Sequence, residues 1–216
     1  MYSKKDVLDA VVTCGLIPVV RVSQAQQAIH VADALQRAGA PIIEITMTVP
    51  GALSVLEELS RSVGDTVILG AGTVLDAQTA RLAILAGAQF VVAPTLDEAT
   101  IQVCNRYAKV AIPGALTPTE ILHAWELGAD MVKVFPADAV GGPGYIKSIK
   151  APLPHIDLVP TGGVDKDTTA DFIRAGAAAV GVGSALVEKK ILEHENYDAL
   201  VENTKEYLRI IKEART

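Results

Sequence analysis

The sequence predicts an α/β fold in which eight parallel strands and their helices close into one (β/α)8 TIM barrel domain over residues 1–216. Apolar runs that fit strands recur at intervals of roughly 20 to 27 residues, and helical spacing follows most of them. An open doubly wound sheet uses the same local pattern, but closure is the more economical arrangement of eight such units. The eight strands are expected to begin near Ile17, Ile42, Val67, Phe90, Val110, Met131, Leu158 and Ala178.

Stretches with helical spacing connect these strands, and residues that favour helix ends flank them. One further helix is expected before the barrel, at Ser3 to Thr13, and another after it, at Asn196 to Arg215. Connecting helices are expected at Ala25 to Ala38, Ala52 to Arg61, Ala77 to Ala86, Thr119 to Leu127 and Thr168 to Ala175. The expected helix-start caps are Asp76, Asp97, Thr117 and Asp165, and the expected helix-end glycines are Gly39, Gly87, Gly128 and Gly176.

The composition limits the classes of function. Half of the residues are hydrophobic and 20% are charged, which fits one large core and excludes a disordered chain. A net charge of −6 without clustered Lys and Arg argues against nucleic-acid binding. There is no secretory signal pattern and no run of about 18 apolar residues, so we expect a cytoplasmic protein that does not enter the membrane. Cys14 and Cys104 form no CxxC pair and suit a reducing compartment.

Lys133 lies in the middle of an apolar run, Met131 to Pro136, that is typical of a buried strand. Burial without a partner favours the neutral amine, and a neutral amine is a nucleophile that can form an imine with a carbonyl substrate. A lysine at an exposed strand edge, with its ammonium group in water, is the structural alternative. The apolar flanks favour the nucleophile.

Glu44 is expected on the same side of the barrel wall as Lys133. Strand alternation places Ile43 and Ile45 towards the helices and Glu44 with Thr46 towards the interior. Two interpretations fit: a structural ion pair that fills the barrel, or a general base beside an imine-forming amine. Catalytic residues of such barrels lie at the carboxyl ends of strands, which favours the general base.

Glycines and hydroxyls follow the last two expected strands. Gly162 and Gly163 come after the seventh, and Gly183 and Ser184 after the eighth. Glycine lets backbone N–H groups approach an anion closely, and barrels commonly bind phosphate at these two positions. The sequence therefore predicts a site for a phosphate or another anion here.

Six short motifs stand in the order seen in the 2-keto-3-deoxy-6-phosphogluconate (KDPG)/4-hydroxy-2-oxoglutarate (KHG) aldolases, which this chain resembles over about residues 15 to 187. The resemblance implies a Schiff-base lysine at Lys133, an acid/base at Glu44, a pyruvate contact at Thr73 and phosphate contacts at the four glycine-loop residues. It also implies a homotrimer that needs no metal. The motifs are EIT from Glu44, GAGTVL from Gly70, IPG from Ile112, VKVFPA from Val132, PTGGV from Pro160 and GVGSAL from Gly181.

Thr48 departs from this resemblance. Many relatives have an arginine four residues after the glutamate, where it contacts the substrate carboxylate, whereas this chain has Thr48. We hypothesise that Arg21, at the end of the first strand, supplies the missing positive charge and lowers the pKa of Lys133. A surface ion pair or a helix-end contact is the alternative role for Arg21.

Two apolar residues are further candidates for the pocket wall, Phe135 beside the lysine and Pro94 after the fourth strand, although ordinary barrel filling explains them equally well. The four histidines have no metal-ligand spacing, so we expect no metal and no other cofactor.

The resemblance implies a class I aldolase that cleaves a 2-keto-4-hydroxy acid to pyruvate and an aldehyde. The expected substrate is 2-dehydro-3-deoxy-6-phosphogluconate, with 4-hydroxy-2-oxoglutarate as a second. A sugar-phosphate epimerase or decarboxylase would share the phosphate loops but use Lys133 as an acid or base. A noncatalytic oligomeric scaffold is the remaining alternative.

Overall fold

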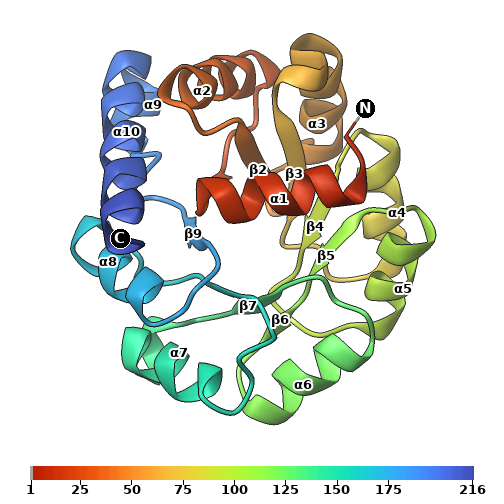
Figure 1. Cartoon of the computed structure of the whole chain (residues 1–216). Coiled ribbons are helices and arrows are strands. Elements are labelled where there is room, and N and C mark those ends of the chain that lie inside the picture. Colours follow the sequence, from red (N-terminus) through yellow and green to blue (C-terminus); the bar gives the residue numbers. More distant parts are fainter. Residues whose placement is uncertain (1) are drawn as a thin grey trace.

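Parallel strands ringed by helices form the body of the protein in the computed structural model, which describes residues 2–216 (Figure 1). The predicted TIM barrel is confirmed. Each expected strand is present, and the fifth is divided into two short segments, β5 and β6. The strands are β1 (Leu16–Val20), β2 (Ile42–Thr46), β3 (Ile68–Gly72), β4 (Phe90–Val92), β5 (Val110–Ile112), β6 (Gly114–Ala115), β7 (Val132–Val134), β8 (Leu158–Pro160) and β9 (Val180–Val182).

The barrel wall consists of two hydrogen-bonded sheets. Six strands lie in the order β5-β4-β3-β2-β1-β9, and three in the order β6-β7-β8. Pro113 separates β5 from β6 because it has no N–H to donate, although its carbonyl accepts a 2.8 Å bond from the Lys133 N–H. A bridge between Thr161 and Gly181 joins β8 to β9, and the Ala178 N–H just before β9 donates a 3.0 Å bond to the Leu158 carbonyl of β8, which completes the wall.

The helices surround this wall, with α1 lying across one end of the barrel (Figure 1). Aspartate and threonine begin four of them as expected, since each cap side chain accepts a hydrogen bond from a backbone N–H in the first turn. The four expected glycines after helix ends all have positive φ angles. The α-helices are α1 (Lys4–Cys14), α2 (Ala25–Ala38), α3 (Ala52–Val63), α4 (Ala77–Leu85), α5 (Glu98–Arg106), α6 (Pro118–Glu126), α7 (Gly142–Lys150), α8 (Lys166–Arg174), α9 (Lys189–Glu193) and α10 (Tyr197–Ala214); the 3-10 turns are η1 (Gly64–Thr66) and η2 (Asp138–Val140).

Besides α5, for which only the cap Asp97 was expected, two helices, α7 and α9, form where no helical stretch was expected. Helix α7 begins within Gly141-Gly142-Pro143-Gly144, and the low helix propensity of these residues gives no helical pattern in the sequence. Helix α9 has only five residues. None of the helices within residues 2–216 combines the length and apolarity needed to cross a membrane.

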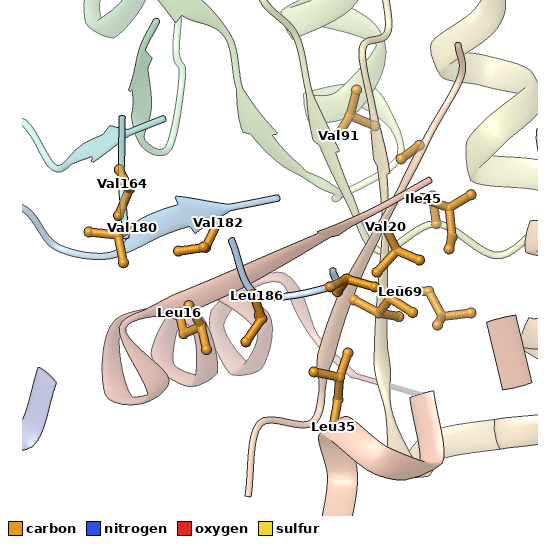
Figure 2. Packing of buried hydrophobic residues seen from close by; sticks show 14 of the residues in the cluster. Leu16, Val20, Leu35, Ile45, Leu69, Val91, Val164, Val180, Val182 and Leu186 are labelled. Atoms are coloured by element: carbon orange, nitrogen blue, oxygen red, sulfur yellow. The ribbon is translucent and has the colours of Figure 1, made fainter. Parts of the chain in front are cut away.

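The buried apolar residues form two clusters on opposite sides of the strands. Outward-facing residues such as Val20, Ile45 and Val182 pack with the helices, and Figure 2 shows part of this layer. Inward-facing residues pack with Val7 and Val11 of α1, which closes that end of the barrel. This second cluster, here called the floor, comprises Val7, Val11, Ile17, Ile42, Ile68, Phe90, Val92, Val110, Ile112, Met131, Val159 and Ala179.

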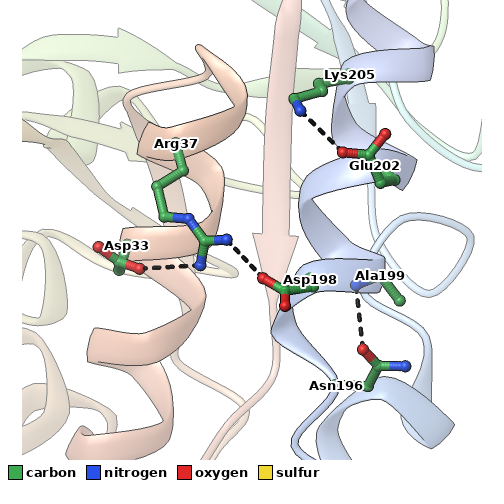
Figure 3. Close-up of polar contacts among 7 residues, drawn as sticks. All are labelled: Asp33, Arg37, Asn196, Asp198, Ala199, Glu202 and Lys205. Carbon is green, nitrogen blue, oxygen red and sulfur yellow. Dashed lines mark hydrogen bonds and ion pairs between the residues drawn. The ribbon is translucent and has the colours of Figure 1, made fainter.

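The last helix, α10, is fixed to the outside of the barrel by contacts with α2 and α8. Arg37 of α2 donates a 2.5 Å hydrogen bond to Asp198, and Asn196 caps the first turn of α10 (Figure 3). Lys166, at the start of α8, pairs with Glu206 of α10. These contacts hold α10 beside the loops that follow β8 and β9.

Candidate active site

Lys133 and Glu44 lie at the end of the barrel interior opposite α1, here called the mouth. Their side chains are 6% and 3% exposed, and their strand neighbours Val132, Val134 and Ile45 pack outward against the helices. Both charged groups therefore face the interior, as alternation predicted. Within residues 2–216 no carboxylate oxygen lies within 4.0 Å of the Lys133 amine, so the two form no direct ion pair.

Gly72 makes room for the Glu44 carboxylate. In the β2–β3 register Thr46 lies opposite Gly72, and a Cβ atom at Gly72 would collide with the Glu44 carboxylate. The collision occurs because both residues face the interior from adjacent strands. A glycine at this position thus sets where the carboxylate can lie, without any demand for positive φ.

Burial shifts both groups towards their neutral forms. It lowers the pKa of the Lys133 amine, while Glu44 raises that pKa and Arg21 lowers it. Burial also raises the pKa of the Glu44 carboxyl against the opposing effects of Lys133 and then Arg21. A larger share of uncharged amine is what nucleophilic attack on a ketone requires.

Arg21 follows β1 and lines a cavity of about 310 Å³ at the mouth. Its guanidinium group lies so close to the loop after β9 that a Cβ atom at Gly183 would be 2.8 Å from Nη1. Within residues 2–216 no carboxylate lies within 4.0 Å of this guanidinium, which does not fit the alternative of a surface ion pair. A strong, exposed cation is thus available to an anion in the cavity.

All four residues of the predicted phosphate loops line this cavity. Across residues 2–216, no protein acceptor is found for the backbone N–H groups of Gly162, Gly163, Ser184 and Ala185. Unpaired N–H groups around a cavity that also holds a guanidinium are suited to bind a phosphate or a carboxylate.

Phe135 connects this anion cavity with the lysine. Its ring lines the cavity and is 39% exposed, and the Lys133 amine lies 4.9 Å from the ring centroid. A cation above an aromatic face is attracted to it. The ring thus covers the amine on the side that faces the cavity.

The other three predicted contacts lie away from the anion cavity. Thr73 follows β3 with an unusual positive φ of 56°, and half-buried Pro94 follows β4 with its carbonyl group against Gly114. Exposed Thr48 follows β2, and its hydroxyl lies 2.8 Å from the hydroxyl of Thr46. These residues belong to the β2–β4 side of the mouth.

Two hydroxyl residues at the mouth were not among the predicted contacts. Thr161 lines the anion cavity, and Thr46, 1% exposed, shares the inward face of β2 with Glu44. Both lie where a strand ends. Strand alternation placed Thr46 towards the interior without assigning it a substrate contact, and the same reasoning could have identified Thr161. Among residues 2–216, no cluster of three or more His, Cys, Asp or Glu side chains is arranged to hold a metal ion.

The arrangement supports carbonyl chemistry on an anionic substrate. A buried amine with a lowered pKa can attack a ketone, a nearby carboxyl with a raised pKa can exchange protons, and the cavity can hold a negatively charged end.

Comparison with known proteins agrees with this chemistry. A family model described as "KDPG and KHG aldolase" matches residues 7–203. A 2-dehydro-3-deoxy-phosphogluconate aldolase of Haemophilus influenzae is 31% identical over 211 residues, which cover 98% of this chain and 99% of that protein. A KHG/KDPG aldolase of Escherichia coli K12 is 29% identical, covering 95% of this chain and 97% of its own.

One similar crystal structure includes a reaction intermediate. It is a KDPG aldolase of Legionella pneumophila with pyruvate captured as a covalent carbinolamine. That protein is 28% identical to this chain and superposes with a TM-score of 0.83, covering 91% of this chain and 96% of the other.

Proposed function

This chain belongs to the KDPG and KHG aldolase family, and from that premise we propose that its preferred substrate is 2-dehydro-3-deoxy-6-phosphogluconate. It is a class I aldolase and therefore a carbon–carbon lyase. Cleavage yields pyruvate and glyceraldehyde 3-phosphate. The second proposed substrate, 4-hydroxy-2-oxoglutarate, yields pyruvate and glyoxylate. The observation that carries the proposal is the buried Lys133 amine, with Glu44 nearby and an anion cavity beside it.

Lys133 is the proposed imine-forming residue. Its amine attacks the C2 ketone to give a carbinolamine, and loss of water leaves a protonated imine. The electron pair of the breaking C3–C4 bond then moves towards the imine nitrogen, which leaves an enamine of pyruvate. Hydrolysis after protonation of the enamine releases pyruvate and regenerates the amine.

Glu44 is the proposed acid and base. As the aldehyde leaves, the C4 hydroxyl proton passes to the carboxylate, directly or through a water molecule, and the same proton is then delivered to C3 of the enamine. The raised pKa of the Glu44 carboxyl supports both halves of this cycle, because the group must accept a proton and hold it briefly.

Arg21 is the proposed anion ligand. Its contact with the Gly183 loop supports binding of the substrate phosphate together with Gly162, Gly163 and Ser184. Binding of the substrate carboxylate, in place of the arginine that Thr48 replaces, is the competing assignment. Replacing Arg21 with Met distinguishes the two assignments. Loss of phosphate binding raises KM for the phosphorylated substrate alone, whereas loss of carboxylate binding also weakens the binding of pyruvate.

The remaining contacts concern the pyruvate end. Thr73, Thr48 and Pro94 on the β2–β4 side are proposed to border the keto-acid carboxylate, and Phe135 to pack over the carbon chain. Thr73→Val removes the Thr73 hydroxyl and is expected to raise the half-saturating pyruvate concentration. The control is Thr95→Val, a change in an exposed threonine after β4 that should leave this concentration unchanged.

Reduction by borohydride in the presence of pyruvate tests the mechanism directly. The expected result is a stable pyruvate-derived mass on Lys133, located by peptide mass spectrometry and missing in a K133M control. An unlabelled Lys133 in folded, pyruvate-saturated protein would remove the imine and favour the use of the lysine as an acid or base. Pyruvate release from 2-dehydro-3-deoxy-6-phosphogluconate, its unphosphorylated form and 4-hydroxy-2-oxoglutarate, assayed side by side, then identifies the preferred substrate.

We also propose a cytoplasmic homotrimer that works without a metal or other cofactor. Exposed leucines on and before α4 support contact with further copies, since Leu75, Leu82 and Leu85 are 59%, 51% and 65% exposed. Both cysteines are free thiols, in keeping with a reducing compartment. Light scattering should give three times the chain mass for the unaltered protein and a smaller assembly for the L82E/L85E variant. An unchanged mass in that variant would place the contact elsewhere.

A further inference from the structure

The anion loop after β9 is held from behind by a residue of the last helix. Asn203 of α10 is 8% exposed, and its amide nitrogen donates a 2.8 Å hydrogen bond to the Leu186 carbonyl and a longer one, 3.4 Å, to the Ala185 carbonyl. The loop itself is a tight turn, in which the N–H groups of Leu186 and Val187 both donate to the Gly183 carbonyl. The unpaired N–H groups of Ser184 and Ala185 therefore lie between the Gly183 carbonyl, which holds the turn, and the carbonyl groups that Asn203 binds.

An asparagine amide is well suited to this contact. Its two donor hydrogens can serve two carbonyl groups at once, and among residues 2–216 no backbone N–H donates to the Ala185 or Leu186 carbonyl. Because the bond reaches the backbone itself, it acts on the direction of the neighbouring peptide groups. A shift of these groups by a fraction of an ångström changes their hydrogen bonds to a bound anion.

The helix does not depend on this contact for its own position. Arg37 with Asp198, the Asn196 cap (both in Figure 3) and the Lys166–Glu206 pair fix α10 separately. Buried Leu200, Tyr207 and Ile211 also pack into the core. Loss of the Asn203 amide is thus expected to loosen the loop and leave the helix in place.

We propose that Asn203 is a positioning residue for the anion site, which sets the loop N–H groups for the phosphate end of the substrate. This inference rests on the proposed function and extends it to a helix outside the barrel. It assigns Asn203 no contact with the reacting atoms. The imine chemistry at Lys133 should therefore be insensitive to Asn203.

Three variants test the proposal. Asn203→Ala removes the amide, Asn203→Asp keeps its shape but removes both donor hydrogens, and Thr204→Val is the control. Thr204 is buried in the same helix, and its hydroxyl donates a 2.7 Å bond to the Leu200 carbonyl, a contact within the helix. For each folded variant we would measure KM and kcat for the phosphorylated substrate, the Kd of inorganic phosphate by calorimetry, and the pyruvate concentration that half-saturates borohydride labelling.

Both Asn203 variants are expected to raise KM and the Kd of inorganic phosphate by about 5- to 10-fold, with Asp the more severe, while kcat and pyruvate saturation stay within twofold. Thr204→Val should change neither constant. Equal losses in kcat and pyruvate saturation, or a lower melting temperature with unchanged phosphate affinity, would overturn the proposal and leave Asn203 a merely structural residue. If the unaltered protein fails to label with pyruvate, the proposed function fails, and the phosphate Kd still tests the loop separately.

Discussion

The floor and the mouth of the barrel are built on the same strands from opposite kinds of side chain. Along β2 the inward face changes from Ile42 to Glu44, and in the β7 region it changes from Met131 to Lys133. A step of two residues thus leads from the apolar cluster closed by α1 to a pair of buried ionisable groups. The floor buries apolar surface and stabilises the fold, whereas the mouth holds charges whose burial opposes folding.

Stability and chemistry are thus separated along each strand and not between strands. Substitutions at the floor should change the free energy of unfolding with little effect on the activity of the folded fraction. Substitutions at the mouth should lower the activity with little effect on the free energy of unfolding.

Replacing Lys133 with Met should give the largest effect. Without the amine no imine forms, so kcat should fall by at least about 10⁴-fold. The buried charge is exchanged for an apolar chain of similar length, so the melting temperature should hold or rise. Turnover and calorimetry on one preparation check both statements, and a marked loss of stability would mean that the lysine also supports the fold.

Replacing Gly72 with Ala should have the next largest effect. The added methyl group collides with the Glu44 carboxylate, so the proposed acid/base is displaced while the floor is untouched. Displacement of a catalytic group by about 1 Å costs on the order of 10²-fold in rate. Kinetics at saturating substrate should show this loss with a nearly unchanged melting temperature; normal kcat would argue that Glu44 is not the acid/base.

Replacing Gly70 with Ala provides the matched change, because its added atom is directed at Phe90 of the floor. Gly70 lies two residues earlier on the same face of β3, and its added methyl group would collide with the Phe90 ring. Overpacking of this kind costs about 1 to 3 kcal/mol of stability. Urea unfolding should reveal the loss, while kcat per folded molecule should stay close to that of the unaltered protein. A large drop in kcat would show that the floor and the mouth are not independent.

The pH dependence of labelling should show the smallest effect. Attack requires the neutral amine, so the rate of borohydride labelling should rise with pH through the pKa of Lys133, which burial lowers. Arg21 lowers this pKa and Glu44 raises it, so the midpoint should move to higher pH in Arg21→Met and to lower pH in Glu44→Gln. Rate profiles from pH 6 to 10 test this, and shifts in the same direction in both variants would contradict the electrostatic account.

Local sequence patterns predicted most of the fold. The strand rhythm and the capping residues gave the barrel and most helix boundaries within about three residues, because each depends on neighbouring residues only. The division of the fifth strand was missed, although Pro113 removes the N–H that would have continued it. Helix α7 was missed because three glycines and a proline cover its start.

The candidate site was predicted where one strand's alternation was sufficient. Glu44 and Lys133 face the interior because of their positions within β2 and β7. Arg21 is different: its place over Gly183 follows from β1 and β9, the first and last strands, becoming neighbours when the barrel closes. Asn203 reaches the loop after β9 from a helix outside the barrel. Such long-range contacts leave no periodic signal in the sequence.

Both sheets of the wall contribute residues to the candidate site. Lys133 belongs to the three-stranded sheet and Glu44 to the six-stranded one, while the anion loops follow one strand from each. A substrate that is bonded to Lys133 and held by both loops would cross-link the two sheets. Bound substrate would then slow amide hydrogen exchange along the seam between β8 and β9, where Thr161 bridges Gly181.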